Sequence, residues 1–234
     1  MCVAASTMKG FVTGSVIRIN DDNAIQQAAN LLEAGYVIAL PTDTVYGLAC
    51  SANDPKAIQR LYEIKGREET KPVAICVAEF QDLRRWGQAD HLANELLGQL
   101  LPGAVTVVVS KSINLDNPFL NPGIKKIGIR IPDFDFIRNV SKAFPFPIAL
   151  TSANKSSEKS TLNVHEFKKL WPSLGATFDG GQLGLQEEQR AASTVIDLSR
   201  KGYYKVIREG VAGQHTVRIV EQFGFRERST FINT

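Results

Sequence analysis

Apolar residues along the chain fall into short runs, separated by stretches in which apolar positions recur every three or four residues. The short runs, rich in Val and Ile, predict strands at 15–19, 36–40, 72–77, 104–110, 126–131, 147–152, 193–198 and 203–209. The spaced positions predict helices at 21–35, 55–65, 79–86 and 90–101. This alternation is typical of an α/β, single-domain fold with a twisted, mostly open mixed sheet and flanking helices.

Two of the predicted helices carry recognisable end signals. Asp21 or Asp22 is expected to cap the first helix, and Gly35 is expected to end it. Asp54 stands before Pro55 at the start of the second helix, where a capping carboxylate and a fixed proline φ both favour helix initiation.

No low-complexity linker divides the chain. We therefore expect one folded domain over 15–224, an N-terminal extension over 1–14 and a loose tail over 225–234. Two connections, 111–124 and 179–192, are long for a compact domain, and loops of this length are candidate lids.

The composition is that of an ordinary globular protein. The 234 residues are 44% hydrophobic and 22% charged, which is enough to bury a large core. Because 27 Lys and Arg oppose 24 Asp and Glu, the net charge is only +3, and any basic site has to be local. No apolar run reaches the roughly 18 to 20 residues that a membrane span requires.

The three cysteines, Cys2, Cys50 and Cys76, show no CxxC or Cys/His spacing. This pattern disfavours a disulfide framework and a structural zinc, and it suits a reducing compartment. The first ten residues lack the features of a signal or transit peptide. We therefore expect a cytoplasmic location, whereas a mitochondrial form would depend on a longer N-terminus.

Polar side chains recur where predicted strands end. The segment "LPTDTVYGL" (40–48) follows one strand, "TSAN" (151–154) follows another, and Arg130, Ser193 and Arg208 lie in or beside three more. Each segment alone is explained by local caps and turns. Five such segments together predict one ligand cleft at the strand ends.

Cations gather after the second predicted helix. Lys65, Arg67 and Lys71 follow one another closely there, and cations at a helix C-terminus commonly do no more than complement the helix dipole. The strand at 72–77 would nevertheless carry them to the same cleft as Arg208. Since one charge-assisted hydrogen bond contributes only about 1.5 to 3 kcal/mol, a triphosphate needs several cations of this kind.

Common catalytic motifs are absent from the sequence. It contains no GxxxxGK[ST] loop, no GxGxxG and no GxSxG. His91, His165 and His215 are scattered without ligand spacing, so no metal site is predicted. These features favour catalysis by positioning and electrostatics over attack by a side-chain nucleophile.

A set of motifs occurs in a fixed order: "LPTDTVYGL", "KGR" with Lys71-Pro72 after it, "LPGAVTVVV", "GIRIP", "TSAN" with Ser160-Thr161 after it, and "STVIDL". Together they resemble the YrdC family of threonylcarbamoyl-adenylate synthases over about residues 15–223. The resemblance implies a YrdC-like catalytic domain and an enzyme, a nucleotidyltransferase that joins L-threonine, bicarbonate and ATP, with Mg²⁺, and releases pyrophosphate. It also implies that the product passes to a tRNA threonylcarbamoyl-transferase complex, which modifies the adenosine next to the anticodon.

The resemblance assigns roles to individual residues. Lys65 and Arg67 are expected to be catalytic. The residues expected to hold ATP are Arg67, Lys71, Lys126, Ser152, Asn154, Ser160 and Arg208. The residues expected to hold threonine are Thr44, Cys76, Arg130, Leu150 and Ser193. Lys126 and Leu150 would act through main-chain groups, and Cys76 stands where many relatives carry a histidine.

Two other functions remain open at this point. A noncatalytic module binding double-stranded RNA or tRNA would use the same local cations. Carbamoyl-adenylate formation, as in hydrogenase-maturation relatives, would require additional regions for which this chain has neither the length nor the cysteine pattern. Asp43 in "PTDT" is a candidate base or metal contact, and equally a turn-stabilising residue.

Overall fold

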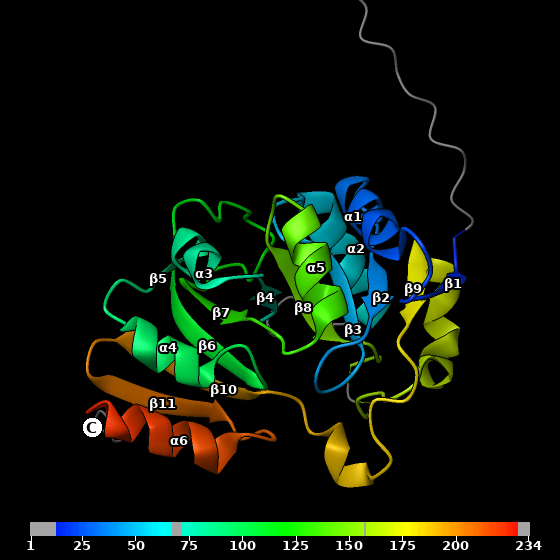
Figure 1. Cartoon of the computed structure of the whole chain (residues 1–234). Coiled ribbons are helices and arrows are strands. Elements are labelled where there is room, and N and C mark those ends of the chain that lie inside the picture. The colour runs from blue at the N-terminus through cyan, green and yellow to red at the C-terminus, as the bar shows by residue number, and fades with distance from the viewer. Residues whose placement is uncertain (1–12, 67–71, 157, 229–234) are drawn as a thin grey trace, which may run out of the picture.

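The computed structural model describes residues 13–66, 72–156 and 158–228, and its twelve strands form one sheet (Figure 1). Their order across the sheet is β1 (Ser15–Arg18), β9 (Ala176–Asp179), β2 (Ile38–Leu40), β3 (Gly47–Ser51), β8 (Ile148–Ser152), β4 (Ala74–Cys76), β7 (Lys126–Arg130), β6 (Val105–Lys111), β10 (Thr194–Arg200), β11 (Tyr203–Arg208) and β12 (Arg226–Glu227). A short strand, β5 (Gly87–Gln88), pairs with the far end of β6. Parallel pairs such as β4–β7 and β6–β10 alternate with antiparallel pairs such as β6–β7 and β10–β11. The predicted open mixed sheet is therefore confirmed.

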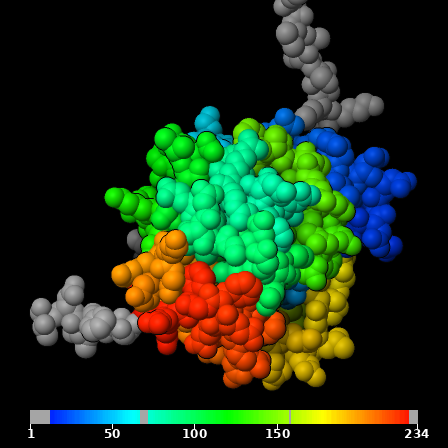
Figure 2. Space-filling model, turned by 60° about the vertical axis from the view of Figure 1, so that its left-hand side comes forward, coloured from blue at the N-terminus to red at the C-terminus, as the bar shows by residue number. Residues whose placement is uncertain are grey.

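Two apolar clusters hold helices against the sheet. Helices α1 (Ala24–Glu33) and α5 (Asp135–Ala143) pack on β1, β9, β2 and β8 around a cluster that includes Leu31, Ile38, Ile137, Ile148 and Phe178. The larger cluster is built from α2 (Pro55–Lys65), α3 (Phe80–Trp86), α4 (Asn94–Leu100), α6 (Gly213–Gln222) and the 3₁₀ segment η1 (Val164–Ser173). Helices α4 and α6 lie against each other, and their surfaces meet in Figure 2. No helix in the described residues is long and apolar enough to cross a membrane.

Local signals set the ends of α2 as expected. The Asp54 carboxylate accepts hydrogen bonds from the main-chain N–H groups of Lys56 and Ala57, and Pro55 occupies the first helical position. Gly66 ends the helix with a φ of 56°, a left-handed conformation that glycine adopts without steric cost.

The predicted cap of α1 is wrong. The helix begins after Asn23, which has a φ of 67°, and Asn23 makes no side-chain cap hydrogen bond. Asp21 instead accepts the main-chain N–H of Arg18 in the preceding turn. Because asparagine tolerates the left-handed conformation well, Asn23 provides the backbone turn before α1, and its side chain does not cap the helix. The prediction that Gly35 ends the helix is confirmed, because its φ is +78° directly after the cap residue Ala34.

Two segments are more ordered than the sequence predicted. The 111–124 connection is tied to the core, since Asn117 donates to the Ala52 carbonyl and Asn121 bonds both main-chain groups of Val73. That anchoring argues against a lid at 111–124. The expected loose tail begins with β12, which pairs in parallel with β11 and so extends the sheet past residue 224.

Candidate functional site

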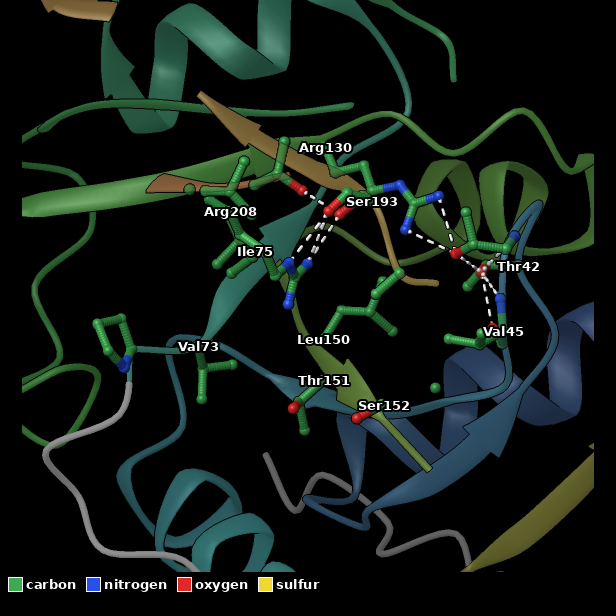
Figure 3. Close-up of a pocket in the computed structure, with 18 of the residues that line it drawn as sticks. Thr42, Val45, Val73, Ile75, Arg130, Leu150, Thr151, Ser152, Ser193 and Arg208 are labelled. Carbon is green, nitrogen blue, oxygen red and sulfur yellow. Dashed lines mark hydrogen bonds between the residues drawn. The ribbon is translucent and has the colours of Figure 1, made fainter. Parts of the chain in front are cut away.

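A cavity of about 700 Å³ lies on the sheet face that α3, α4 and α6 do not cover (Figure 3). It is walled by the segment between β2 and β3, by β4, β6, β7, β8, β10 and β11, and by the chain that follows β8. Ten residues predicted for the site line it: Thr44, Lys65, Lys126, Arg130, Leu150, Ser152, Asn154, Ser160, Ser193 and Arg208. Arg67 and Lys71, also predicted for the site, lie outside the described residues.

Strand alternation selects which side chains reach the cavity. Thr106 and Val108 on β6, and Lys126, Gly128 and Arg130 on β7, line the cavity, whereas the residues between them belong to the helix-covered core. A Cβ atom on Gly128 would stand 2.8 Å from the Thr106 methyl carbon. Glycine at this position therefore leaves room for the neighbouring side chains at the cavity floor.

Arg130 is held by three acceptor residues from two parts of the chain. Its Nη2 donates to Asp43 Oδ1 at 2.5 Å, both terminal nitrogens donate to Thr44 Oγ1 at 3.2 Å, and Nε donates to the Gly103 carbonyl. Burial lowers the pKa of the Arg130 guanidinium, and the neighbouring Asp43 carboxylate opposes that effect. Asp43 thus acts as the counterion of Arg130.

Thr42 stabilises the turn that leads from β2 into the cavity. Its Oγ1 accepts the main-chain N–H groups of Thr44 and Val45 and donates to the Val45 carbonyl at 2.7 Å. A threonine turn of this kind explains part of the polar content of "LPTDTVYGL". The sequence placed Thr42 in a strand-end segment expected at the cleft, but assigned no individual role to it.

Lys65 joins α2 to the chain after β8. Its Nζ donates to the Ser152 carbonyl at 2.7 Å, to the Asn154 carbonyl at 2.6 Å and to Asn154 Oδ1 at 3.0 Å. The residue is only 3% exposed. The Lys65 ammonium group therefore mainly positions Ser152 and Asn154, two residues that were predicted to hold ATP.

Arg208, at the end of β11, and Ser193, just before β10, point toward each other in the cavity wall (Figure 3). Arg208 donates from Nε and Nη2 to the Ser193 carbonyl at 3.2 and 2.9 Å, and from Nη2 to Ser193 Oγ at 3.3 Å. Ser193 Oγ lies 2.8 Å from Thr106 Oγ1. Burial, together with the charge of Arg130, lowers the pKa of Arg208.

Lys126 carries its own counterion. Its Nζ donates to Asp197 Oδ2 at 2.7 Å, and the Ser199 N–H donates to the other carboxylate oxygen. Burial alone would raise the pKa of Asp197, but the hydrogen bonds from Lys126 and Ser199 outweigh it, so the pKa is lowered.

The cavity therefore has a clear electrostatic character. Its described lining residues include four cations, Lys65, Lys126, Arg130 and Arg208, and no carboxylate. Asp43 forms an ion pair with Arg130, and Asp197 forms one with Lys126, although neither carboxylate lines the cavity. Such a lining favours an anionic ligand with several acceptor oxygens.

The described lining does not fit a resident Mg²⁺. Protein-held Mg²⁺ usually takes one or two carboxylates, and none lines the cavity in the described part of the chain. No group of three or more His, Cys, Asp or Glu within residues 13–66, 72–156 and 158–228 is arranged for a metal ion either. Any Mg²⁺ here would arrive as part of the nucleotide substrate.

Cys76 is the one described residue of the predicted set that does not line the cavity. It pairs with Arg130 on β7 and so lies on the same sheet face as the cavity, but its side chain is buried in the α1 and α5 cluster, beside Ser141. Burial raises the pKa of the Cys76 thiol to about 12, which keeps the thiol neutral. Cys76 therefore lies beside Arg130 as a buried, neutral thiol, and its contact with threonine stays a prediction.

Thr106 is the most informative residue that sequence reasoning missed. It is the only polar residue in the run "AVTVV" (104–108), and it is 4% exposed. A lone hydroxyl in a buried strand requires a partner, and this requirement was a usable signal.

The comparisons with known proteins agree with this geometry. Residues 30–210 match the family model of Sua5, YciO and YrdC proteins, which is described as "Telomere recombination". Threonylcarbamoyl-AMP synthases of Homo sapiens and Bos taurus are each 46% identical to this chain, over 85% and 86% of it and over 71% and 73% of their own lengths.

A solved structure shares the fold. The crystal structure of P. abyssi Sua5 complexed with L-threonine matches with a TM-score of 0.80 at 27% identity, over 92% of this chain. The match spans 62% of that protein, which is less than two thirds of its length. Because the family model covers most of the chain and close relatives align along nearly all of it, this protein belongs to the Sua5–YciO–YrdC family.

Proposed function

We propose that the chain is an L-threonylcarbamoyladenylate synthase, which condenses L-threonine, bicarbonate and ATP into threonylcarbamoyl-AMP and pyrophosphate. The observation that carries the proposal is the cavity, where residues assigned to threonine and residues assigned to ATP line one space with four cations and no described carboxylate. The names of the most similar relatives agree with this activity.

The chemistry requires two bond-forming steps. The amine of threonine attacks the carbon of bicarbonate, a C–N bond forms, and water leaves to give a carbamate. A carbamate oxygen then attacks the α-phosphorus of ATP in line, and the bond from that phosphorus to the bridging oxygen breaks, so that pyrophosphate leaves with the electron pair. Neither step needs a covalent enzyme intermediate, so orientation and charge stabilisation are the main contributions of the protein.

The two ends of the cavity suit the two substrates. Arg130, Thr44 and the adjacent turn form a compact cationic corner that supports binding of the threonine carboxylate and hydroxyl. Lys126, Arg208 and the chain pinned by Lys65 form a wider cationic wall that supports a nucleotide. Arg67 and Lys71 would add further charge on the nucleotide side.

The finer assignments belong to the same proposal. ATP enters as its Mg²⁺ complex, and bicarbonate supplies the carbamoyl carbon. The product is passed to a tRNA threonylcarbamoyl-transferase complex. The free, buried thiols of Cys50 and Cys76 support a reducing compartment, for which we propose the cytoplasm.

The test is mass spectrometry of purified protein incubated with ATP, Mg²⁺, labelled bicarbonate and threonine. We expect a labelled threonylcarbamoyl-AMP only when all substrates are present, and its loss in Arg67→Ala and Arg208→Ala. Arg200→Ala is the matched control, because Arg200 stacks on Tyr203 in the same hairpin, outside the cavity. If the wild type forms neither adduct nor pyrophosphate while it binds structured RNA, the binding-module function replaces the synthase.

A further inference from the structure

Thr106 occupies an unusual position in β6. It is the only polar residue in the run 104–109, it lines the cavity, and its Oγ1 lies 2.8 Å from Ser193 Oγ. Among the described residues, Ser193 is the only hydrogen-bond partner of the Thr106 hydroxyl. Nothing in the family resemblance assigns Thr106 a role, so its contact with an assigned residue calls for an explanation.

The two hydroxyl groups of Thr106 and Ser193 together have one proton that their mutual hydrogen bond does not use, and this proton is available to a ligand. Each hydroxyl has one proton and two acceptor lone pairs, and the bond between Thr106 and Ser193 uses one of the two protons. Arg208 is a donor only, so its bond to Ser193 Oγ takes a lone pair of that oxygen. When Thr106 donates to the second lone pair, the Ser193 proton has to point elsewhere, and the open side of Ser193 is the cavity.

The orientation of Thr106 is fixed by its surroundings. Threonine is branched at Cβ, and such side chains adopt few χ1 rotamers. Its methyl carbon lies over Gly128, where a Cβ atom would stand only 2.8 Å away. With the methyl group over Gly128 and the hydroxyl against Ser193, the side chain has a defined direction.

We propose that Thr106 is a positioning residue of the reaction: it donates to Ser193 and so holds the Ser193 hydroxyl as a donor toward the anionic reacting group in the cavity. This inference rests on the proposed synthase function and adds the residue that orients the Ser193 hydroxyl. Ser193 is assigned to threonine and Arg208 to ATP, and Ser193 bonds both Arg208 and Thr106. The donor is aimed in advance, so it costs no reorganisation during the reaction.

The direct test is Thr106→Val, which keeps the shape and branching of the side chain and removes the hydroxyl. We expect kcat/KM for threonine to fall about 10-fold to 100-fold, the loss typical of one hydrogen bond to a charged group. Thr106→Ser retains the donor but loses the methyl that fixes its direction, so it should recover most of the activity. Loss of activity in Thr106→Ser equal to that in Thr106→Val would overturn the role of the hydroxyl.

A double-mutant cycle separates positioning from a general structural effect. If Thr106 acts through Ser193, Thr106→Val should cost less than about twofold when it is introduced into Ser193→Ala. The proposal is wrong if the two losses multiply. Thr216→Val is the control for loss of a buried hydroxyl, because Thr216 donates to the Ala212 carbonyl in α6, outside the cavity. Its kinetics should match the wild type even where its thermal stability is lower.

The same cycle measured by calorimetric titration with ATP and L-threonine distinguishes this proposal from the proposed function. A wild type that binds both substrates without forming the adduct would refute the synthase activity, while non-additive affinities in the cycle would still support the part of the inference in which Thr106 orients the Ser193 hydroxyl toward a bound ligand. Additive affinities would refute the inference alone. A wild type that neither binds nor reacts would refute both.

Discussion

At the scale of single residues, the pair of Asp43 and Arg130 shows how the cavity can hold a buried cation. Arg130 and Asp43 have side-chain exposures of only 7% and 12%. A buried guanidinium is tolerated when its donors are satisfied and its charge is balanced. The sequence predicted a ligand role for Arg130, but the role of Asp43 depended on an arginine that lies 87 positions further along the chain.

Removing the counterion should therefore be costly. Asp43→Ala leaves the buried Arg130 without its carboxylate, and we expect the free energy of unfolding to fall by about 3 kcal/mol. Urea denaturation measures this loss. Combining Asp43→Ala with Arg130→Met removes both charges and should restore part of the stability, and a double variant less stable than Asp43→Ala would contradict the ion-pair explanation.

Substrate selection is also decided by single groups. A cavity that hydrogen-bonds the threonine hydroxyl should reject valine strongly, because a buried polar group would then lose its partner. Serine lacks only a methyl group, which is worth about 1 to 3 kcal/mol, so serine should be used at a reduced rate. Competition assays with the three amino acids test this order, and equal use of valine and serine would show that polar groups do not recognise the side chain.

At the scale of elements, the sequence predicted helices and strands correctly where interactions between neighbouring residues determine them, and failed where contacts between distant residues do. Helix α2 was predicted well because Asp54, Pro55 and Gly66 act on their immediate neighbours. Strand β3 was not predicted, since its residues, Gly47–Ser51, are all buried and have neither alternation nor many β-branched side chains. The burial of Cys76 in the α1 and α5 cluster was not predicted, because that cluster joins segments far apart in the sequence.

Tyr46 connects the segment before β3 to the 179–192 connection. Its hydroxyl donates to the Gly181 carbonyl at 2.7 Å and accepts the Gly180 N–H at 3.0 Å, while its ring lies 5.6 Å from that of Phe167. These bonds fix the start of a connection that was predicted to act as a lid. The segment is thus anchored at Tyr46 and, near its other end, by the bond from Arg190 to the Ser160 carbonyl.

Tyr46→Phe keeps the ring packing and removes only the hydroxyl. We expect faster proteolytic cleavage within 179–192 and a loss of about 1 to 3 kcal/mol in the free energy of unfolding, since the Gly180 N–H loses its partner. Limited proteolysis and urea denaturation measure the two effects. Tyr203→Phe, which alters a tyrosine that is 38% exposed, is the control. Equal cleavage of the two variants would show that the hydroxyl does not anchor this connection.

At the scale of the whole molecule, stability should depend on pH through Asp197. Its folded-state pKa is lowered, so its carboxylate stabilises the fold above the unfolded pKa of about 3.9 and loses that effect as the pH falls through the lower folded value. Wild-type stability should therefore exceed that of Asp197→Asn at neutral pH, and the difference should shrink below about pH 4. Urea denaturation at several pH values tests this sign, and a difference that grows in acid would contradict it.

The overall architecture and most of the cavity were predictable, and the missing parts share one cause. Alternating apolar periods identified the sheet, and ten members of the described lining were named from strand-end residues, from the cations after the second helix and from the family resemblance together. The internal hydrogen bonds of the site were not predictable, because they join residues far apart in sequence. Lys65 bonds Asn154 across 89 positions, and Thr106 bonds Ser193 across 87.

The order of the cavity walls along the chain has a consequence for biosynthesis. Thr44 emerges early from the ribosome, whereas Ser193 and Arg208 emerge only after most of the chain has been translated. Until then β6 lacks its neighbour β10, and Lys126 and Arg130 form an incomplete wall. A nascent chain can therefore assemble the α1 and α2 half while it is still tethered, but it cannot enclose its substrates before β11 has left the exit tunnel.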